Sequence, residues 1–462
     1  MKYSNKLVFI LLATSFFGGC STLELEREET FTGLMQSRGI PPQSEPASIS
    51  NRILSLADVQ HLALNNHPTI KQAEIALSIG ELELKRDQSL SNPILSGLRQ
   101  TTDETGQGPK IALSLVTSLT DLITLPYRQN LARQEFRALQ LDVAHQVMSN
   151  LLHAQHHYFK LVLSEHLCRI AESRLELYTT KLELAERFHA AGNLEPTEYS
   201  IHQVDAAQAE IDLAEKRHQL AQARYELSAL LGVDTHGSWG VPGGIPMPIA
   251  LDNATQELVA IAQENRLDYM RDALELVLSQ TKLRNSGWRR WIGDIEIGFE
   301  RERETDGAIL KGPSLDVEIP VFRNREQKDL ASLSSELAQL ALDAKALDIK
   351  NSLHTTVVQL RAKEAALSTF REKLLPGLGD LTAHTQAEYN FMLTGVFEVL
   401  NQKAAEFEAQ ASLIDLLQSY WDTRIGLIAI TGTSLPTEID WVESNSFYSV
   451  ATAIPDHSHH TH

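Results

Sequence analysis

The clearest pattern in the sequence is an alternation of aliphatic and acidic residues in its second half. Residues 313–322 read PSLDVEIPVF, and residues 294–302 before them read DIEIGFERE. In the later stretch every second residue is aliphatic: Leu315, Val317, Ile319 and Val321. Glu296, Asp316 and Glu318 stand between aliphatic residues. Since successive side chains of a strand point to opposite faces, the pattern predicts two strands with one aliphatic and one acidic face.

A second pair of strand candidates lies in the first half, at NPILSGLRQ (92–100) and PKIALSLVTSL (109–119). In the later of the two, aliphatic residues alternate with small ones: Ile111, Ala112, Leu113, Ser114 and Leu115. Runs of about nine residues with this alternation suit the strands of a bilayer-spanning barrel. Four strands are too few to close a barrel around a pore, so several chains must contribute.

Long stretches without glycine or proline predict unusually long helices. Residues 127–191 allow one helix of 65 residues, which is about 100 Å long. Further uninterrupted stretches are 197–231, 321–375 and 396–425. Two seven-residue rows follow the first helix: Leu163, Ile170, Leu177 and Leu184, and Leu161, Cys168, Leu175 and Leu182. An offset of two residues is roughly 200° around a helix, so the rows lie on opposite faces and predict a packing neighbour on each side.

The chain also repeats itself. GPKIALSL from Gly108 recurs as GPSLDVEI from Gly312, which is 204 residues later, and each is followed by a long helical stretch. SLADVQHLALNNHPTIKQAEIAL from Ser55 recurs loosely as NATQELVAIAQENRLDYMRDALEL from Asn253. Recurrence at a fixed spacing indicates an internal two-fold repeat, in which each half reads helix, strand, loop, strand, long helix, turn and helix.

The N-terminal residues predict that the chain is exported from the cytoplasm. Lys2 and Lys6 precede the apolar run LVFILLATSFF and then GGCS, which is the pattern of a secretory signal. A signal that ends at cysteine after small residues resembles a lipobox, so Cys20 would carry a lipid and begin the mature chain. The alternative is an ordinary signal followed by a structural cysteine. The other cysteine, Cys168, stands alone in a helical stretch, so no disulfide framework is expected and it should be buried.

Six segments follow from these patterns. Glycine and proline gather in the linker, which separates the two repeats. After the signal no run approaches 18 apolar residues, so a chain that spans a bilayer must do so as a closed barrel. The segments are the signal peptide 1–19, the lipidated N-terminal segment 20–50, the first repeat 51–232, the linker 233–254, the second repeat 255–432 and the C-terminal tail 433–462.

The overall negative charge limits the kinds of molecule that the chain can bind. The chain of 462 residues holds 41 lysines and arginines against 60 aspartates and glutamates, a formal net charge of −19. Nucleic-acid binding requires a basic surface, so this balance excludes nucleic acid as a partner. An acidic protein suits cations better than anions.

Several phrases, taken in order, resemble the outer-membrane efflux protein family, the TolC-like channels, over nearly the whole mature chain. They include LSLADVQHLALNNHPTIKQAE, GPKIALSL, TDLITLPYRQNLARQE, AERFHAAGNLEPTEYSIHQVDAAQAE, GPSLDVEIPVFRNREQ and YNFMLTGVFEVLNQKAAEFEAQ. The lipoprotein branch that resembles CusC-type metal-efflux channels is the most similar group.

The resemblance implies a mixed α and β membrane protein. In it, a homotrimer closes a 12-stranded outer-membrane β-barrel, with four strands per chain. A periplasmic α-helical barrel continues it, and the linker and tails form an equatorial collar. Such a protein is a passive, lipid-anchored duct. Its partners would be a periplasmic adaptor protein and an inner-membrane pump of the resistance-nodulation-division type. No cofactor is expected apart from the lipid on Cys20.

The resemblance also assigns roles to two helical turns, at 187–194 and 390–397, as the periplasmic tips. Arg187, Gly192 and Gly395 would contact the partner protein there.

Residues near the second tip would form the entrance. Tyr389 begins the entrance motif, and Glu398 would contribute to an acidic ring that constricts the closed channel. The chain departs from the family at Asn401, which replaces a second acid, and at Thr394, which replaces an arginine, so a gate latch must use other residues. Glu198 holds the equivalent place in the first half, which makes a two-layer constriction possible.

Three acids and a histidine tail are the candidate cation-binding groups. Facing a lumen, Glu296, Asp316 and Glu318 would attract cations. The tail holds four histidines, which can bind zinc, copper or nickel or can be an incidental end or cloning remnant: His457, His459, His460 and His462. A second cluster stands at helical spacing and is more typical of a solvated or core face: His153, His156 and His157.

The resemblance implies an outer-membrane channel of a tripartite efflux system, and the acidic charge, Glu398 and the histidine tail favour metal cations as its substrate. Drug efflux or type I secretion is the alternative within the fold, and a lipid-anchored periplasmic coiled-coil scaffold or adaptor is the alternative of another class. Catalysis is not expected, because Glu186 and His189 form a single Glu-x-x-His element and a di-metal carboxylate site needs two. Phosphate-loop and nucleophile-elbow motifs are absent from the sequence.

Overall fold

The computed structural model describes residues 33, 52–101, 103, 108–250, 254–289, 293–319, 325–433 and 439–443. The helices and strands given below lie in one compact unit, residues 43–462. The predicted signal peptide, Cys20 and the four tail histidines lie outside the described residues.

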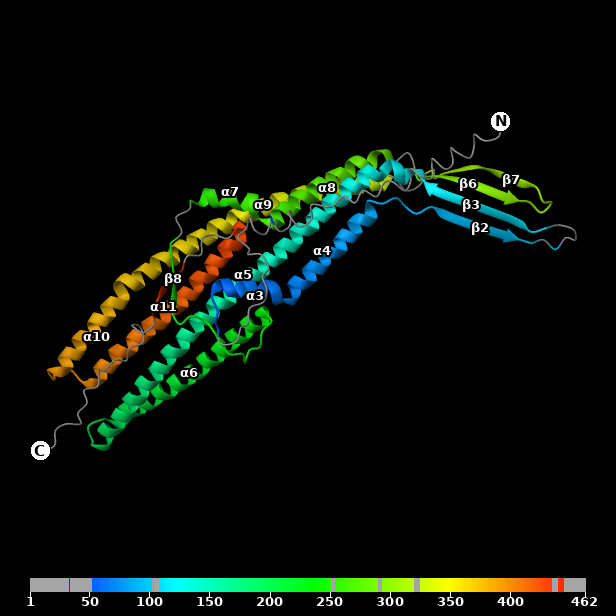
Figure 1. Ribbon diagram of the computed structural model, residues 1–462. Helices are drawn as coiled ribbons and strands as arrows, with labels where there is room; N and C mark the ends of the chain where they lie inside the picture. The colour runs from blue at the N-terminus through cyan, green and yellow to red at the C-terminus, as the bar shows by residue number, and fades with distance from the viewer. Residues whose placement is uncertain are drawn as a thin grey trace. The chain divides into compact units, whose positions relative to one another are not determined.

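The two halves contain the same order of elements (Figure 1). The first half holds α3 (Leu56–Asn66), α4 (Pro68–Asp87), β2 (Ile94–Gln100), β3 (Lys110–Ser118), α5 (Leu119–Ala190) and α6 (Pro196–Leu231). The second holds α7 (Thr255–Asn265), α8 (Leu267–Arg289), β6 (Ile295–Arg303), β7 (Ile309–Val317), α9 (Arg325–Thr369), the π-helical turn η1 (Phe370–Leu374), α10 (Leu375–Asn390) and α11 (Val396–Thr431). The predicted sequence of helix, strand pair, long helix and helix is thus found twice, and the duplication itself stays a prediction.

The four predicted strands form one sheet. Its order is β2-β3-β6-β7 and every neighbouring pair is antiparallel. The two hairpins, one from each half, therefore join through the β3–β6 contact. β3 runs straight into α5, where the Ser118 side chain accepts a hydrogen bond from the backbone N–H of Asp121 and caps the helix. The sheet and the long helix are thereby continuous.

Two long helices pass through prolines at which the sequence pattern predicted an end. α5 has 72 residues and includes Pro126, because the cap at Ser118 starts it earlier than residue 127. α9 continues into α10 past Pro376 through the π-helical turn η1, where the Leu375 N–H donates to the Phe370 carbonyl. A wider turn before proline accommodates the ring and the missing N–H, so a proline in the sequence did not end the helix.

The predicted two-sided packing of α5 is confirmed. On one side Cys168 and Ala171 pack against Leu213 of α6. On another, the Phe159 ring stacks on Trp421 of α11 with centroids 4.1 Å apart. Cys168 is a buried free thiol, as expected.

The described part of the glycine- and proline-rich segment between the halves contains two short strands. Within it β4 (Trp239–Gly240) pairs in parallel with β1 (Arg52–Ile53), and β5 (Ile245–Pro248) pairs with β8 (Ile439–Val442) in an antiparallel manner. Arg224 of α6 donates to the carbonyls of Thr235, Gly237 and Trp239 and lies 4.1 Å from the Trp239 ring centroid. The segment therefore ties the start and the end of the helical region together.

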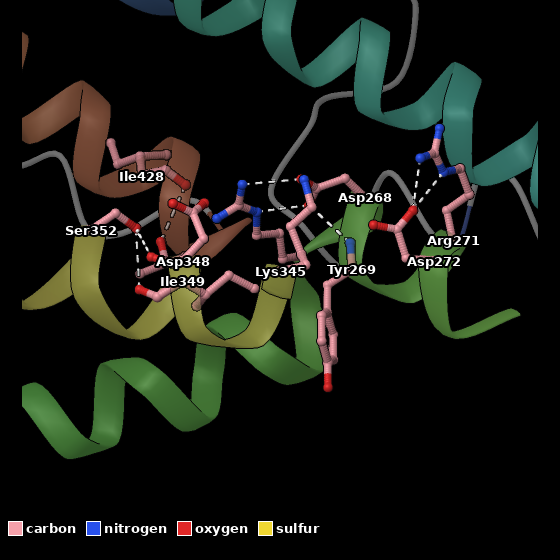
Figure 2. Close-up of polar contacts among 11 residues, drawn as sticks. Asp268, Tyr269, Arg271, Asp272, Lys345, Asp348, Ile349, Ser352 and Ile428 are labelled. Carbon is pink, nitrogen blue, oxygen red and sulfur yellow. Dashed lines mark hydrogen bonds and ion pairs between the residues drawn. The ribbon is translucent and has the colours of Figure 1, made fainter. Parts of the chain in front are cut away.

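A half-buried ion-pair cluster joins α8 to α9 (Figure 2). Asp268 accepts hydrogen bonds from Arg266 at 2.7 and 3.0 Å and from Lys345 of α9 at 3.1 Å. Burial acts to raise the pKa of the Asp268 carboxyl, but the hydrogen bonds and charges of Arg266 and Lys345 outweigh it and hold that pKa below its usual value. Asp268 is therefore ionised and fixes the start of α8 against α9.

Candidate functional site: the sheet and the helical turns

The register of the sheet separates its aliphatic from its acidic side chains. Residues directly opposite each other on antiparallel strands lie on the same face. The aliphatic face carries Leu95, Ile111, Leu113, Leu115, Ile295, Ile297, Phe299, Ile309, Leu315 and Val317. The acidic face carries Ser96, Lys110, Ser114, Glu296, Glu300, Glu302 and Asp316, together with the apolar Ile94, Leu98 and Leu310. The predicted segregation is present, although both faces are more mixed than the sequence pattern indicated, since the aliphatic face also carries Arg99, Arg301, Arg303 and Lys311.

Large apolar side chains on the aliphatic face are open to the surroundings. Leu115 is 51% exposed, Phe299 53% and Leu315 65%. They belong to three different strands, so the exposure extends across the sheet. A contiguous apolar surface of this kind requires a covering phase or partner.

The three acids assigned to a lumen lie at the end of the sheet nearest the helices. Glu296 and Asp316 are direct register partners on β6 and β7. Glu318 follows β7, where its N–H donates to the Asp294 carbonyl at 2.8 Å and its carboxylate accepts from the Asp294 N–H at 3.3 Å. Like charges directly opposite each other repel, so the first pair is a place of concentrated negative charge on the acidic face.

Sequence reasoning missed one charged contact on this face. Lys110 of β3 forms an ion pair with Glu302 of β6 and lies 3.7 Å from Glu304. The partners are almost two hundred residues apart in sequence, so only the register reveals them.

The first helical turn is closed by glycine. Gly192 has a φ of +77°, its N–H donates to His189, and the Asn193 N–H donates to the Phe188 carbonyl at 2.8 Å. This is a helix C-terminal cap, in which a left-handed residue lets the chain reverse into α6. Arg187 is exposed in the last turn of α5.

The second helical turn has the same design with a different residue. Met392 has a φ of +60°, and the Leu393 N–H donates to the Glu388 carbonyl at 2.9 Å. The side chains here are unusually open: Phe391 is 78% exposed, Met392 93% and Leu393 76%. A methionine in the left-handed region is strained, and three adjacent exposed apolar side chains indicate a contact surface. The sequence pattern predicts the turn but does not single out this apolar triplet.

The predicted entrance acids occupy matching places after the two turns. Glu198 lies in the first turn of α6 and Glu398 in the first turn of α11, and both are exposed. Glu398 accepts a hydrogen bond from Gln402 at 3.0 Å. Gly395 caps α11, and its carbonyl accepts from the Glu398 N–H at 3.1 Å. Tyr389 and Thr394 are half-buried beside the turn.

Asn401 has a partner that sequence reasoning did not find. The ammonium of Lys181, on α5, donates to the Asn401 side-chain carbonyl at 2.8 Å, which links α5 to α11. Lys181 is buried, and burial lowers the pKa of its ammonium while Asp205 opposes that shift. A lysine between Leu177 and Leu184 on one apolar row was the available signal. The replacements at Thr394 and Asn401 mean that a gate latch must use other residues. The Lys181–Asn401 hydrogen bond is a candidate for that latch.

An aromatic cluster joins the two turns. The His202 ring of α6 stacks on Phe397 of α11 with centroids 4.8 Å apart, and Phe188 of α5 lies 5.9 Å from Phe397. Burial lowers the pKa of His202, the Lys181 charge lowers it further, and Asp205 and Glu198 act in the opposite direction. The ring is therefore largely neutral and packs as an aromatic residue.

Two histidines of the predicted cluster on α5 face acids of neighbouring helices. His156 lies 2.8 Å from Asp422 and His157 lies 3.2 Å from Glu226. Within the described ranges no three histidine, cysteine, aspartate or glutamate side chains are grouped to hold a metal ion. Within the same ranges no helix combines the length and the apolar character needed to cross a bilayer.

A four-stranded sheet with an aliphatic face, continued by long paired helices that end in capped turns, is the fold of the TolC-like outer-membrane efflux channels. The comparisons with solved structures agree. The chain is similar to CusC, whose crystal structures concern folding and transmembrane channel formation. The TM-score is 0.68 and the identity 15%, over 85% of this chain and 99% of that one. It matches the outer membrane protein VceC of Vibrio cholerae with a TM-score of 0.66 and 15% identity, over 82% and 96%.

Among curated proteins, the chain is similar to the cobalt-zinc-cadmium resistance protein CzcC of Cupriavidus metallidurans. The two are 21% identical over 384 residues, which cover 79% of this chain and 87% of the relative. No protein-family model matches the chain.

Proposed function

We propose that three copies of this chain form an outer-membrane duct of a tripartite efflux system. The observation that carries the proposal is the sheet, whose aliphatic and acidic faces continue directly into the long helices. In this arrangement the aliphatic face contacts lipid and the acidic face lines the lumen. Glu296, Asp316 and Glu318 then draw cations into the pore.

The open edges of the sheet support assembly. β2 and β7 each pair on one side only within the described residues. Because an even number of antiparallel strands separates them, β7 of one chain can pair with β2 of the next in the same antiparallel sense. Three chains give a closed 12-stranded barrel with no free edge.

The helical turns are the proposed docking surface for a periplasmic adaptor, which connects the duct to an inner-membrane resistance-nodulation-division pump. Arg187, Gly192 and Gly395 lie at the two turns, and the apolar side chains of 391–393 supply the contact area. Three copies of Glu398, with Glu198 as a second layer, form the cation-attracting entrance. A lipid on Cys20 holds the chain at the membrane.

Metal cations are the proposed substrate, which the duct conducts passively without catalysis. The acidic strands, the entrance acids and the similarity to a cobalt-zinc-cadmium resistance protein support this choice. The histidines of the tail, His457, His459, His460 and His462, are proposed to bind such ions weakly at the exit or entrance. An acidic lumen also suits cationic drugs, which keeps drug efflux as the second candidate. A scaffold without a pore leaves the exposed aliphatic face without a role.

Deletion of the gene tests the substrate. We expect the deletion strain to become sensitive to cobalt, zinc, cadmium, copper or silver salts, and the wild-type gene to restore tolerance. A strain that loses drug tolerance and keeps metal tolerance contradicts the metal assignment. Complementation with Cys20→Ala separates the role of the lipid from that of the pore.

A further inference from the structure

Four cations stand together on the aliphatic face of the sheet, at the end remote from the helices. Arg99, Arg301, Arg303 and Lys311, here called the basic band, lie on β2, β6 and β7 and are all exposed. Arg99 and Arg303 are both register partners of Ile111, and Arg301 and Lys311 share a row with Leu113. Two successive rows of the sheet therefore mix cations with aliphatic side chains.

The basic band differs from the charges on the other face. There Lys110 pairs with Glu302 within the chain. In the described part of the chain none of the four cations forms an ion pair with an acid. The strand residues that share their face include no aspartate or glutamate. The acids of these strands are all on the opposite side, so the positive charge of the band is not neutralised from within the sheet.

The arrangement has a cost that an external anion removes. Arg301 and Lys311 are direct register partners, so their Cα atoms lie about 5 Å apart with like charges on one face. Like charges directly opposite each other destabilise a sheet. Arg303 is the next residue on that face, roughly 7 Å along β6. Guanidinium groups bind phosphate through two parallel hydrogen bonds, so this cluster suits a phosphate group.

We infer that the basic band binds the anionic phosphate headgroups of lipid at the outer margin of the aliphatic face. The inference rests on the proposed function, in which that face contacts lipid. The rows nearer the helices, with Leu115, Phe299 and Leu315, would contact acyl chains, and the band would contact the headgroups. Long cationic side chains at the end of a membrane strand reach the interface at little cost. A free anion would not require the adjoining apolar rows.

Titration of the detergent-solubilised full chain with fluorescent phosphatidic acid tests this assignment. The band variant carries R99Q, R301Q, R303Q and K311Q, and the control variant removes the same charge from exposed helix positions by K71Q, K328Q, K350Q and R361Q. We expect wild type and control to prefer phosphatidic acid over phosphatidylcholine, and the band variant to lose about tenfold or more of that preference. Inorganic phosphate at equal concentration should not compete.

Two results overturn the inference: a preference unchanged in the band variant, or equal competition by inorganic phosphate, which indicates a free-anion site. A second variant, R301Q/K311Q, controls for misfolding. It removes two like charges that face each other, so without anionic lipid it should unfold at the same or a higher temperature than wild type. A lower unfolding temperature there counts against the repulsion argument. Single-channel recording in phosphatidylcholine bilayers separates the two proposals, since wild-type channels without lipid preference contradict only this inference, and no channels contradict the proposed function.

Discussion

At the scale of single residues, the two helical turns place different residue types at the left-handed position. Both use a left-handed residue to reverse the chain, and the first half places Gly192 there while the second places Met392. The first choice avoids strain, and the second keeps a large apolar side chain fully exposed at the turn. A strained residue that persists at a surface is typical of a functional contact.

Exchange of the two residue types measures this difference. Met392→Gly should raise the free energy of unfolding by up to about 1 kcal/mol, because it relieves the left-handed strain. Gly192→Ala is the matched control and should lower it by about 1 kcal/mol. A methyl group added at Gly192 meets no atom within 4 Å, so the control reports backbone strain alone. Denaturant unfolding supplies both values, and equal losses in the two variants contradict the account.

Some contacts between single residues could not be predicted from the sequence. The Lys181–Asn401 hydrogen bond joins residues 220 positions apart, and the basic band exists only through the register of four strands. Neither leaves a local pattern. In contrast, the alternation around Asp316 predicted a strand and its two faces, because period two is a local property of the chain.

At the scale of elements, helix extents were predictable in their interiors and wrong at prolines. Stretches without glycine or proline predicted the long helices α5, α6, α9 and α11, because helix formers continue through each of them without interruption. The pattern also placed a helix start after Pro126 and a helix end before Pro376, but α5 already begins at Leu119 and contains Pro126, and a π-helical turn before Pro376 lets α9 continue into α10. Compensation of a missing N–H depends on the neighbouring turn, which a single breaker residue does not reveal.

The contact between α8 and α9 depends on pH through Asp268. Its pKa is lower in the folded chain than in the unfolded chain, so its stabilising contribution is complete above the unfolded value near pH 4 and is lost as pH falls through the folded value. Asp268→Asn should lower the free energy of unfolding at pH 7 by about 2 kcal/mol and reduce its loss on acidification.

The control for this variant is Asp380→Asn, an exposed position on α10. It should leave both the stability and its pH dependence nearly unchanged. Thermal unfolding of the three proteins between pH 3 and pH 7 makes the comparison. An Asp268→Asn protein that is as sensitive to acid as wild type contradicts the role given to this carboxylate.

At the scale of the whole molecule, one sheet and one set of paired helices have to serve two environments. In the proposed trimer, the exposed aliphatic face contacts lipid, the acidic face contacts water and cations, and the open edges of β2 and β7 pair with further copies of the chain. A closed trimer provides all three kinds of contact together. In the proposed trimer the entrance acids of the three chains come close to one another, while within one chain Glu398 is exposed and accepts a hydrogen bond from Gln402.

Single-channel conductance of the purified full chain in planar lipid bilayers tests the central claim most directly. The account predicts trimers that open discrete, cation-selective channels. Glu398→Gln should reduce the selectivity, because it removes charge from the entrance. Glu408→Gln, an exposed acid on the same helix, should preserve it. A chain that stays monomeric and produces no discrete conductance would contradict the account.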